Sequence, residues 1–303
     1  MSNDLLTVQV PSGIGDISWL WSKLRHVALE RPIRFEAATG WPFRAAEYLE
    51  LLPELHSHGY CELEFRDIAS IVAQRNWKTW AEASGLGSAI LPLENNMHLE
   101  RGKPLAAWFP DLPVDYHYPL ATTDDYKDRA EKLLGDLNGR VAIGVSCASY
   151  RGANAWKTWS GNEWVDLLVR LASCERFHNQ PPIYVMMGGG WDDLTREVGE
   201  RLDTEHGLEV RSTVGRTHFG VAVELHRRLH YYIGFSSGLG IVRTVLRKPT
   251  FMLWPEHQVP LSTSWADPED LCSALYRVSG YVDPEIVYWA VLAQWREIGL
   301  IGG

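Results

Sequence analysis

The chain has 303 residues, of which 46% are hydrophobic and 22% charged, and its formal net charge is −9. This composition is that of an ordinary globular protein, and the length is comfortable for two domains, so we do not expect a disordered chain. The negative charge disfavours a broad grip on a nucleic-acid backbone, although a local basic groove is compatible with it.

The sequence predicts a cytoplasmic protein. It begins Met1-Ser2-Asn3-Asp4, without the basic segment and apolar run of a signal peptide, and its apolar runs are too short to cross a bilayer. The cysteines lack metal-type spacing and are typical of buried thiols in a reducing compartment. They are Cys61, Cys147, Cys174 and Cys272.

The first half of the chain alternates short apolar runs with helical periodicity. Strands are expected over 5–10, 33–38 and 61–68, helices over 18–24, 44–52 and 122–134, and irregular structure over 76–80 and 91–93. Residues 135–139 then break the pattern. We therefore predict a first domain over 1–136, a second over 137–280, and a C-terminal helix within 281–303 that packs back on the first domain.

The turn after the first strand carries two glycines and a carboxylate. Gly13 and Gly15 allow a close approach of the backbone to a ligand. Asp16 is most simply a helix cap, and the alternative is a carboxylate that accepts a proton from a nucleophile. Further along, the polar segment 95–104 contains Asn96, His98 and Glu100, and it suits either a substrate contact or a solvated loop.

In the second half, strands are expected over 141–145, 182–187, 208–211, 231–235 and 250–254, and helices over 162–172, 191–202, 220–229, 238–248, 267–276 and 283–298. Residues 188–190 are three glycines directly after a strand, which indicates either a close backbone approach or a flexible loop. Ser236-Ser237-Gly238 begins a helix after another strand. Its free N–H groups and hydroxyls suit an anionic oxygen such as a phosphate, and the simpler reading is a Ser-capped turn.

Strands that alternate with helices in both halves predict an α/β fold of two parallel-sheet domains. In such folds ligands bind outside the carboxyl ends of the strands. The glycine-rich turns of both halves fall at those ends, so we expect the functional site there.

Taken in order, these motifs resemble those of the GT-B glycosyltransferases of family 9, the heptosyltransferase-like group. The family's small-x-Gly-Asp motif corresponds to Gly13-Ile14-Gly15-Asp16, and its Lys-x-Trp-Pro segment to Lys157-Thr158-Trp159-Ser160. Its Asp-Thr-Gly-Leu-x-His element, followed by Gly-Lys-Pro, corresponds to residues 236–241 and Arg247-Lys248-Pro249. Ser236 and Ile241 stand where the family has Asp and His, which argues against a standard ADP-heptose donor. The pattern also resembles heptosyltransferase-like reading frames of tailed phages.

The resemblance implies two Rossmann-like domains that face each other across a cleft. It also implies an inverting, metal-independent transfer of a sugar from a nucleotide-sugar to a hydroxyl of a saccharide or lipopolysaccharide-like acceptor, with no cofactor besides the donor. Asp16 would be the general base, and Asn96, His98 and Glu100 would bind the acceptor. The residues expected to bind the donor are Gly13, Gly15, Ser146, Ser149, Lys157, Trp159, Gly188, Gly189, Trp191, Ser236, Ser237, Gly238 and Leu239.

Three alternatives stay open on the sequence alone. One is a phage glycosyltransferase that modifies a hydroxymethylated DNA base, which would need a basic strip near Asp16; Arg25, Arg31, Arg34 and Arg44 could supply it. A second is a nucleotide-sugar epimerase or hydrolase. The third is a non-catalytic nucleotide-sugar-binding protein, because a shared fold does not determine the reaction.

Overall fold

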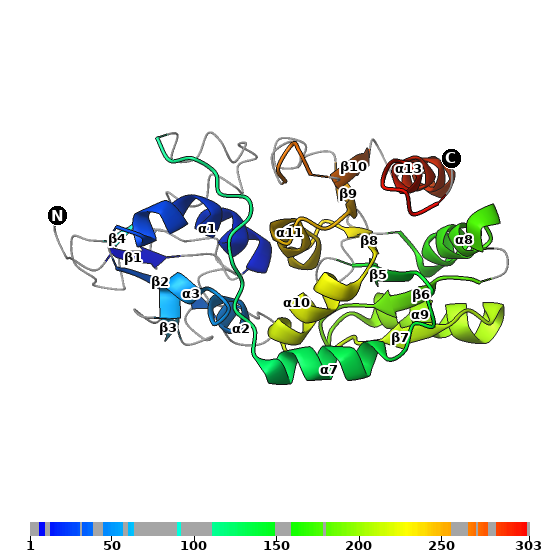
Figure 1. Ribbon diagram of the computed structural model, residues 1–303, viewed down its shortest axis with the longest axis horizontal. Helices are drawn as coiled ribbons and strands as arrows, with labels where there is room; N and C mark the ends of the chain where they lie inside the picture. Colours follow the sequence, from blue (N-terminus) through cyan, green and yellow to red (C-terminus); the bar gives the residue numbers. More distant parts are fainter. Residues whose placement is uncertain are drawn as a thin grey trace.

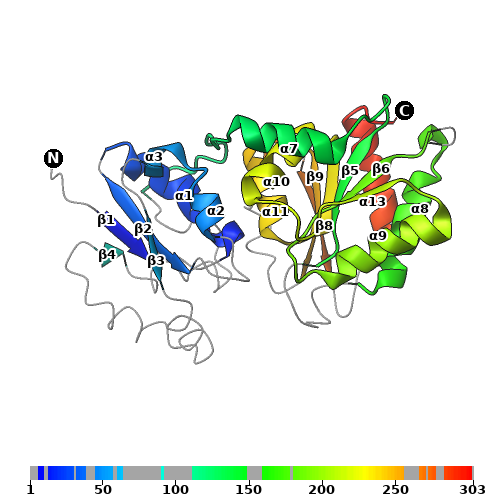
Figure 2. The ribbon, with the colours of Figure 1, turned by 90° about the horizontal axis from the view of Figure 1, so that it is seen from below.

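The computed structural model describes residues 6–9, 13–30, 32–38, 45–56, 60–63, 90–91, 111–148, 159–177, 180–255, 266–270, 272–277 and 283–301. For some residues within helices and strands, Asp16 among them, the description covers the backbone alone. The described elements form two parallel sheets with helices packed on them, joined by a connecting segment, residues 111–123 (Figures 1 and 2).

The first sheet has the strand order β3-β2-β1-β4, and all its pairs are parallel. Its elements are β1 (Leu6–Gln9), α1 (Ile14–Ala28), β2 (Ile33–Ala38), α2 (Ala45–Leu49), α3 (Pro53–His56), β3 (Tyr60–Leu63) and β4 (Ile90–Leu91). The expectation of irregular structure at residues 91–93 was wrong at its start, because Leu91 pairs with Val8 of β1. A two-residue strand is too short to show a period in the sequence.

The second sheet has the order β10-β9-β8-β5-β6-β7 and is also parallel. Because β8 pairs with β5 on the side opposite β6, the strand order reverses between β5 and β8, as in doubly wound sheets. Its strands are β5 (Ala142–Ser146), β6 (Ile183–Met186), β7 (Val210–Ser212), β8 (Tyr231–Phe235), β9 (Thr250–Pro255) and β10 (Cys272–Arg277). The helices of this half are α7 (Asp124–Leu134), α8 (Gly161–Ala172), η2 (Glu175–Phe177), α9 (Asp193–His206), α10 (Phe219–Arg228), α11 (Gly238–Val245) and α13 (Pro284–Glu297).

The strand β10 corrects another expectation, since residues 267–276 were expected to form a helix. Cys272–Arg277 instead pairs in parallel with β9 along its whole length, from Cys272 opposite Thr250 to Arg277 opposite Pro255. The edge of β9 offers unpaired backbone groups, and pairing with them outweighs the local helical pattern.

Two helices pack differently from what the sequence suggested. The C-terminal helix α13 was expected on the first half, but it lies against α8, and Tyr231 of β8 donates a hydrogen bond to its Gln294. Trp295 of the same helix packs edge-on against Phe177 and Tyr231. The helix α7 precedes the expected domain division at 136/137 but packs on α10, which follows it. Apolar side chains on these helices are buried by whichever neighbouring element offers a matching apolar face.

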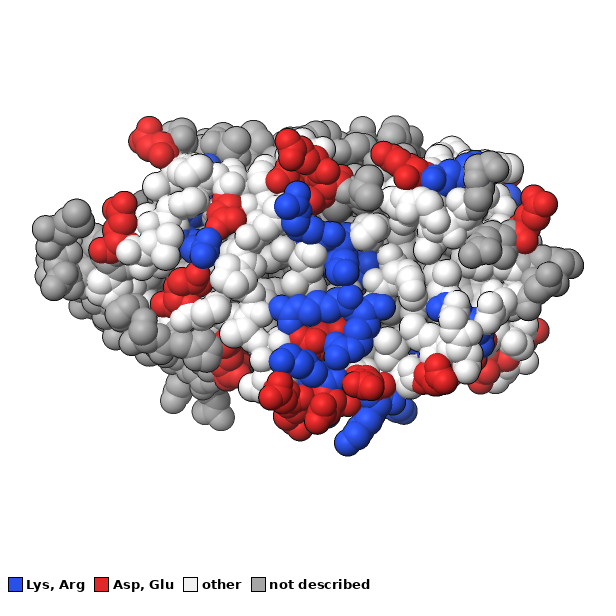
Figure 3. Space-filling view, viewed as in Figure 1, with Lys and Arg blue, Asp and Glu red and all other residues white. Residues whose placement is uncertain are grey.

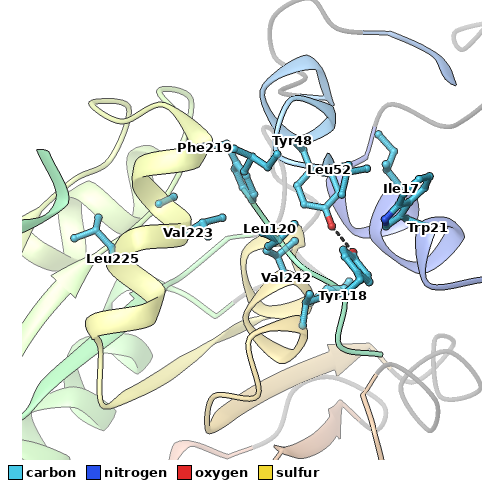
Figure 4. Packing of buried hydrophobic residues seen from close by; sticks show 14 of the residues in the cluster. Ile17, Trp21, Tyr48, Leu52, Tyr118, Leu120, Phe219, Val223, Leu225 and Val242 are labelled. Carbon is cyan, nitrogen blue, oxygen red and sulfur yellow. Dashed lines mark hydrogen bonds between the residues drawn. The ribbon is translucent and has the colours of Figure 1, made fainter. Parts of the chain in front are cut away.

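One hydrophobic cluster runs through both halves of the molecule (Figure 4). Ile17 and Tyr48 of the first half belong to it together with Phe219 and Val242 of the second. The Tyr48 ring meets the Phe219 ring edge-on at 5.6 Å between centroids. A second cluster, built around Trp164, Ile233 and Trp295, covers the other face of the second sheet. The interface between the halves is therefore continuous with a core.

The connecting segment 111–123 is bonded to both halves. Toward the first half, the Tyr118 hydroxyl is 2.6 Å from Ser18 Oγ and also hydrogen-bonds the Tyr48 hydroxyl (Figure 4). Toward the second, the Thr122 hydroxyl donates to Glu224 of α10 at 2.5 Å. Because each of these polar groups has a partner, burying them here is tolerated.

A buried arginine fixes α11 against the end of α10. Arg243 is fully buried, and it donates to the carbonyl oxygens of His226 at 2.6 Å, Leu229 at 3.2 Å and Pro249 at 2.9 Å. The carbonyls at the end of a helix lack intrahelical partners, so a guanidinium there satisfies them and complements the helix dipole. The start of α11, at its other end, is thereby held in place.

Cations gather in a band across the middle of the face shown in Figure 3, over α10 and the end of α11. Carboxylates accompany them: Glu224 pairs with Arg227 and Arg228, and Asp270 lies 3.5 Å from Arg247. These ion pairs compensate part of the positive charge of the band.

Candidate active site

The start of α11 follows β8 without a side-chain cap among the described residues. The backbone of Ser237, the residue before the helix, is extended, and its hydroxyl makes no bond to the first turn. Ser236 is anchored by its N–H, which donates to the carbonyl of Leu253 at 2.9 Å. The first-turn N–H groups therefore keep their donor capacity, at the positive end of the helix dipole.

The start of α1 follows β1 in the same way. Gly13 is the residue before the helix, and within the described part of the chain no side chain caps it. The Gly13 carbonyl accepts the N–H of Ile17 at 3.0 Å, which closes the first turn. Asp16 lies within that turn. Both halves thus present the start of an uncapped helix at the carboxyl end of a strand.

These two helix starts touch each other. A Cβ added to Gly238 would lie 2.9 Å from Ile14 Cβ and 3.1 Å from the Gly15 backbone nitrogen. A Cβ added to Gly15 would lie 2.7 Å from Ile241 Cδ1. Such distances are shorter than normal carbon contacts, so glycine at both positions permits the approach. The two predicted glycine turns, far apart in the sequence, are brought together.

A tryptophan pair supports this contact. Trp19 of α1 stacks on Trp254 of β9, with 6.2 Å between the ring centroids and 17° between the planes. Both side chains are buried. Stacked aromatic pairs contribute beyond the area that they bury, so this pair favours the observed placement of α1 on the second half.

At the reversal of strand order, three hydroxyls come together. Ser146 ends β5, is buried, and donates to the carbonyl of Ala148 at 3.3 Å. The buried Tyr232 hydroxyl of β8 is 3.5 Å from Ser237 Oγ. Burial raises the pKa of Tyr232 to about 12, and hydrogen bonds with Ser237 and Ser146 offset part of that rise. Tyr232 was not among the site residues expected from the sequence. The signal available was a phenol four residues before Ser236, on the strand face opposite that of Tyr231.

The glycine turn after β6 is filled by the chain itself. A Cβ on Gly188 would lie 2.5 Å from Asp192 Oδ2, and one on Gly189 would lie 2.4 Å from Trp191 Nε1. A Cβ on Gly215 would lie 2.7 Å from Gly190 Cα. Of the two sequence interpretations, close backbone approach therefore describes this turn, with the chain's own atoms as neighbours.

Asp192 ties this turn to the end of β5. It is buried at the start of α9 and accepts hydrogen bonds from the Thr195 N–H at 3.0 Å and the Thr195 hydroxyl at 2.7 Å. Thr195 Oγ1 in turn accepts the Cys147 N–H at 2.8 Å. Burial raises the pKa of Asp192 to about 6, although the Thr195 hydrogen bonds lower it in part.

Apart from Gly188, Gly189 and Trp191 in the turn after β6, the expected site residues separate into three groups. Gly13, Gly15, Ser236, Ser237, Gly238 and Leu239 lie at the two helix starts, with Ser146 at the neighbouring end of β5. Trp159 lies instead in the second core, where its ring packs edge-on against Trp164 and Phe235, so packing accounts for it. Outside the described residues lie Asn96, His98, Glu100, Ser149 and Lys157.

Ile241 and Arg25, two residues singled out in the sequence, both have structural contacts. Ile241, where the family resemblance has His, is buried and packs onto Gly15, so an apolar side chain suits this contact. Arg25, named for a basic strip near Asp16, is bonded to Glu54 at 2.7 Å and to Asp115. The side chains of Arg31, Arg34 and Arg44 fall outside the description.

The described ranges lack two features, a metal-type side-chain cluster and a membrane-spanning helix. There, no group of three or more His, Cys, Asp or Glu side chains is arranged to hold a metal ion. In the same ranges, no helix combines the length and apolar character needed to span a bilayer.

Three glycosyltransferases are among the solved structures that share this fold. A family 9 glycosyl transferase from Veillonella parvula matches with a TM-score of 0.68 and 13% identity over 98% of both chains. The E. coli ADP-heptose LPS heptosyltransferase II matches with a TM-score of 0.69 and 17% identity over 98% of this chain and 100% of that one. E. coli heptosyltransferase WaaC with ADP matches with a TM-score of 0.57 and 12% identity over 96% and 100%.

No protein-family model matches the chain, and no curated protein matches it by sequence. At the identities of the structural matches, the likeness establishes the fold, an α/β arrangement with parallel sheets as in GT-B proteins. The expected fold class is confirmed to that extent. The three structures come from bacteria and give no support to the expected phage relationship.

Proposed function

We propose that this protein is a glycosyltransferase whose two sheets belong to two domains on either side of a donor-binding cleft. The observation that carries the proposal is the contact between the starts of α1 and α11 at Gly15 and Gly238. It brings the segment with Asp16 beside an uncapped helix start, which suits a reaction between a proton acceptor and a phosphate ester. The contacts of α7 with α10 favour a domain division before α7.

The start of α11 would hold the diphosphate of a nucleotide-sugar. Backbone N–H groups of Ser237, Gly238 and Leu239, with the hydroxyls of Ser236 and Ser237, offer several donors in one place. Ser146, Ser149 and Lys157 would add to this set from the end of β5 and the segment after it. Such donors stabilise the charge that grows on the leaving diphosphate without requiring a metal ion.

Asp16 would act as the general base. It takes the proton of the acceptor hydroxyl as that oxygen attacks the anomeric carbon from the side opposite the diphosphate. The bond between the anomeric carbon and the diphosphate oxygen breaks, and its electron pair leaves with the nucleoside diphosphate. A new glycosidic bond forms with inversion, and the proton ends on Asp16. General-base catalysis of this kind contributes roughly two to four orders of magnitude in rate.

The donor is proposed to be a nucleoside diphosphate sugar other than ADP-heptose. Related structures of E. coli WaaC contain ADP and an ADP-2-deoxy-2-fluoro heptose, which supports the nucleotide-sugar class. Ser236 and Ile241 stand where the family resemblance has Asp and His, so the sugar contacts would differ. Gly188, Gly189 and Trp191 would line the nucleotide, and Asn96, His98 and Glu100 the acceptor, a hydroxyl of a saccharide.

The test combines donor binding with transfer. A panel of nucleotide-sugars is screened by thermal shift, since a ligand that binds only the folded state raises the melting temperature. Transfer from the selected donor to saccharide acceptors is then followed by mass spectrometry. We expect Asp16→Asn to retain donor binding and to lose transfer by about two to four orders of magnitude. Lys157→Ala should weaken donor binding.

Asp124→Asn provides the matched control, because Asp124 also lies in the first turn of a helix, α7. It should transfer sugar at the wild-type rate. The proposal fails if no nucleotide-sugar in the panel stabilises the protein. Full transfer by Asp16→Asn would remove Asp16 from the mechanism.

A further inference from the structure

The hydroxyl of Tyr232 lies next to the start of α11. This is also where the strand order of the second sheet reverses, between β5 and β8. The Tyr232 side chain is completely buried, and its oxygen is 3.5 Å from Ser237 Oγ. The Ser146 hydroxyl, at the end of β5, is its other hydroxyl neighbour. One phenol thus connects the ends of the two strands between which doubly wound sheets bind their ligands.

Two glycines leave the room that the phenol occupies. A Cβ on Gly234 would lie 2.9 Å from the Tyr232 hydroxyl oxygen and 2.9 Å from the Ser146 carbonyl oxygen. A Cβ on Gly240 would lie 3.2 Å from Tyr232 Cε1. On another side, the His226 ring packs against the Tyr232 ring, with 5.2 Å between the ring centroids. Close packing on these sides restricts the ring to one position, so the hydroxyl has a defined place.

The Ser237 hydroxyl, next to the Tyr232 hydroxyl, does not cap α11 as a serine before a helix usually does. A serine before a helix normally accepts an N–H of the first turn. Here that bond is not made, and the hydroxyl lies near Tyr232 instead. If the phenol donates to Ser237 Oγ, the Ser237 proton is free to donate outward. The first-turn N–H groups of α11 are left for the same ligand.

We propose that Tyr232 is a positioning residue, whose hydroxyl orients the Ser237 hydroxyl toward the diphosphate of the donor. This inference rests on the proposed function, because it concerns the same anion site. Tyr232 itself does not contact the substrate in this proposal and acts through Ser237. Hydrogen bonds in a chain strengthen one another, so losing the inner donor weakens the outer contact.

The experiment measures nucleoside diphosphate affinity in Tyr232→Phe. Isothermal titration calorimetry with ADP, GDP, UDP and CDP identifies the tightest diphosphate for the wild-type protein, and that compound is the probe. We expect Tyr232→Phe to bind it about tenfold more weakly, which is the size of effect that one hydrogen bond can have. In a Ser237→Ala background, Tyr232→Phe should have no further effect on affinity, because the positioned group is gone.

Tyr231→Phe is the matched control. Tyr231 is the adjacent residue of β8, equally buried, and its hydroxyl donates to Gln294 of α13. Both Phe variants should lose similar stability in urea denaturation, but only Tyr232→Phe should lose affinity. Circular dichroism and the urea midpoint verify that each variant is folded.

The outcomes separate the two proposals. If the wild-type protein binds a diphosphate and Tyr232→Phe binds it within twofold, the positioning role is overturned and the proposed function is untouched. An equal loss of affinity in Tyr231→Phe would also overturn it, because the effect would then be a general loosening of the strand. If the wild-type protein binds none of the four diphosphates, both proposals are overturned.

Discussion

Six of the described helix starts fall into two kinds, and α8 differs from both, because its Glu163 accepts the Ser160 N–H at 2.6 Å. At α7, α9, α10 and α13 a side chain accepts an N–H of the first turn: Thr123, Asp192, His218 and Asp283 respectively. At α1 and α11 no described side chain does so, although Ser237 has the hydroxyl for it. At each capped start one first-turn N–H has a side-chain partner, whereas at α1 and α11 no described side chain accepts any of these N–H groups.

The uncapped starts are also the ones that meet. Gly15 and Gly238 bring α1 and α11 into contact. Each helix follows a strand that is paired on both sides: β1 lies between β2 and β4, and β8 between β5 and β9. A side-chain cap typically stabilises a helix by about 1 kcal/mol relative to alanine, but by only a few tenths relative to a glycine such as Gly13. The convergence of α1 and α11, both without a described side-chain cap, is the observation that supports the proposed binding site.

The largest expected effect concerns the most buried cap. Burial raises the pKa of Asp192 to about 6, above the value of about 4 in an unfolded chain. The folded protein therefore binds the proton more tightly, and its free energy of unfolding falls as pH rises from about 4 to about 6, by up to about 3 kcal/mol. Asp192→Asn should lack this fall in urea denaturation at pH 4, 5, 6 and 7.

Asp193→Asn is the control for that series, because Asp193 is the exposed neighbour of Asp192 and pairs with Arg196 at 2.5 Å. It should keep the pH dependence of the wild-type protein. If Asp192→Asn shows the same fall as the wild-type protein, the cap of α9 is not a buried charge that titrates in this range.

The next effect concerns the contact between the uncapped starts. Gly238→Ala places a methyl group 2.9 Å from Ile14 Cβ and 3.1 Å from the Gly15 nitrogen, where backbone cannot yield easily. We expect a loss of about 1–3 kcal/mol in the free energy of unfolding, as for other overpacked sites. Gly190→Ala is the matched change, since a Cβ at Gly190 would lie 3.9 Å from Gly215 Cα, an ordinary van der Waals distance. It should cost no more than about 0.5 kcal/mol. Equal losses would show that α1 and α11 do not depend on glycine.

The smallest expected effect is the difference in stability loss between removing the Asp283 side chain and removing the Ser237 hydroxyl. Asp283 accepts the Glu285 N–H at 2.8 Å, so Asp283→Ala should lower the free energy of unfolding by about 1 kcal/mol. Ser237→Ala removes no cap and should change it by a few tenths of a kcal/mol at most. Urea denaturation without ligand measures both. A loss at Ser237 as large as that at Asp283 would mean that Ser237 caps α11 in solution.

Local patterns in the sequence predicted most elements of this protein. The strand β2 was expected over 33–38 and the helix α8 over 162–172, each within one residue of the structure. Alternation and helical periodicity are properties of consecutive residues, so they can be read without knowing the partner. The glycine turns after β1 and β8 were located for the same reason, as was the α/β class.

Only the tertiary structure decided what those elements meet. The strand β10 exists because the edge of β9 is available, and α13 lies on α8 because that helix and β8 bury Trp295 and Gln294. Tyr232 lies at the candidate site because β8 pairs with β5, which places its hydroxyl between the ends of two strands. Gly15 and Gly238 are more than two hundred positions apart, and their contact depends on how the two halves pack. Pairings between distant segments leave no local period, so a single sequence locates the turns but not their meeting.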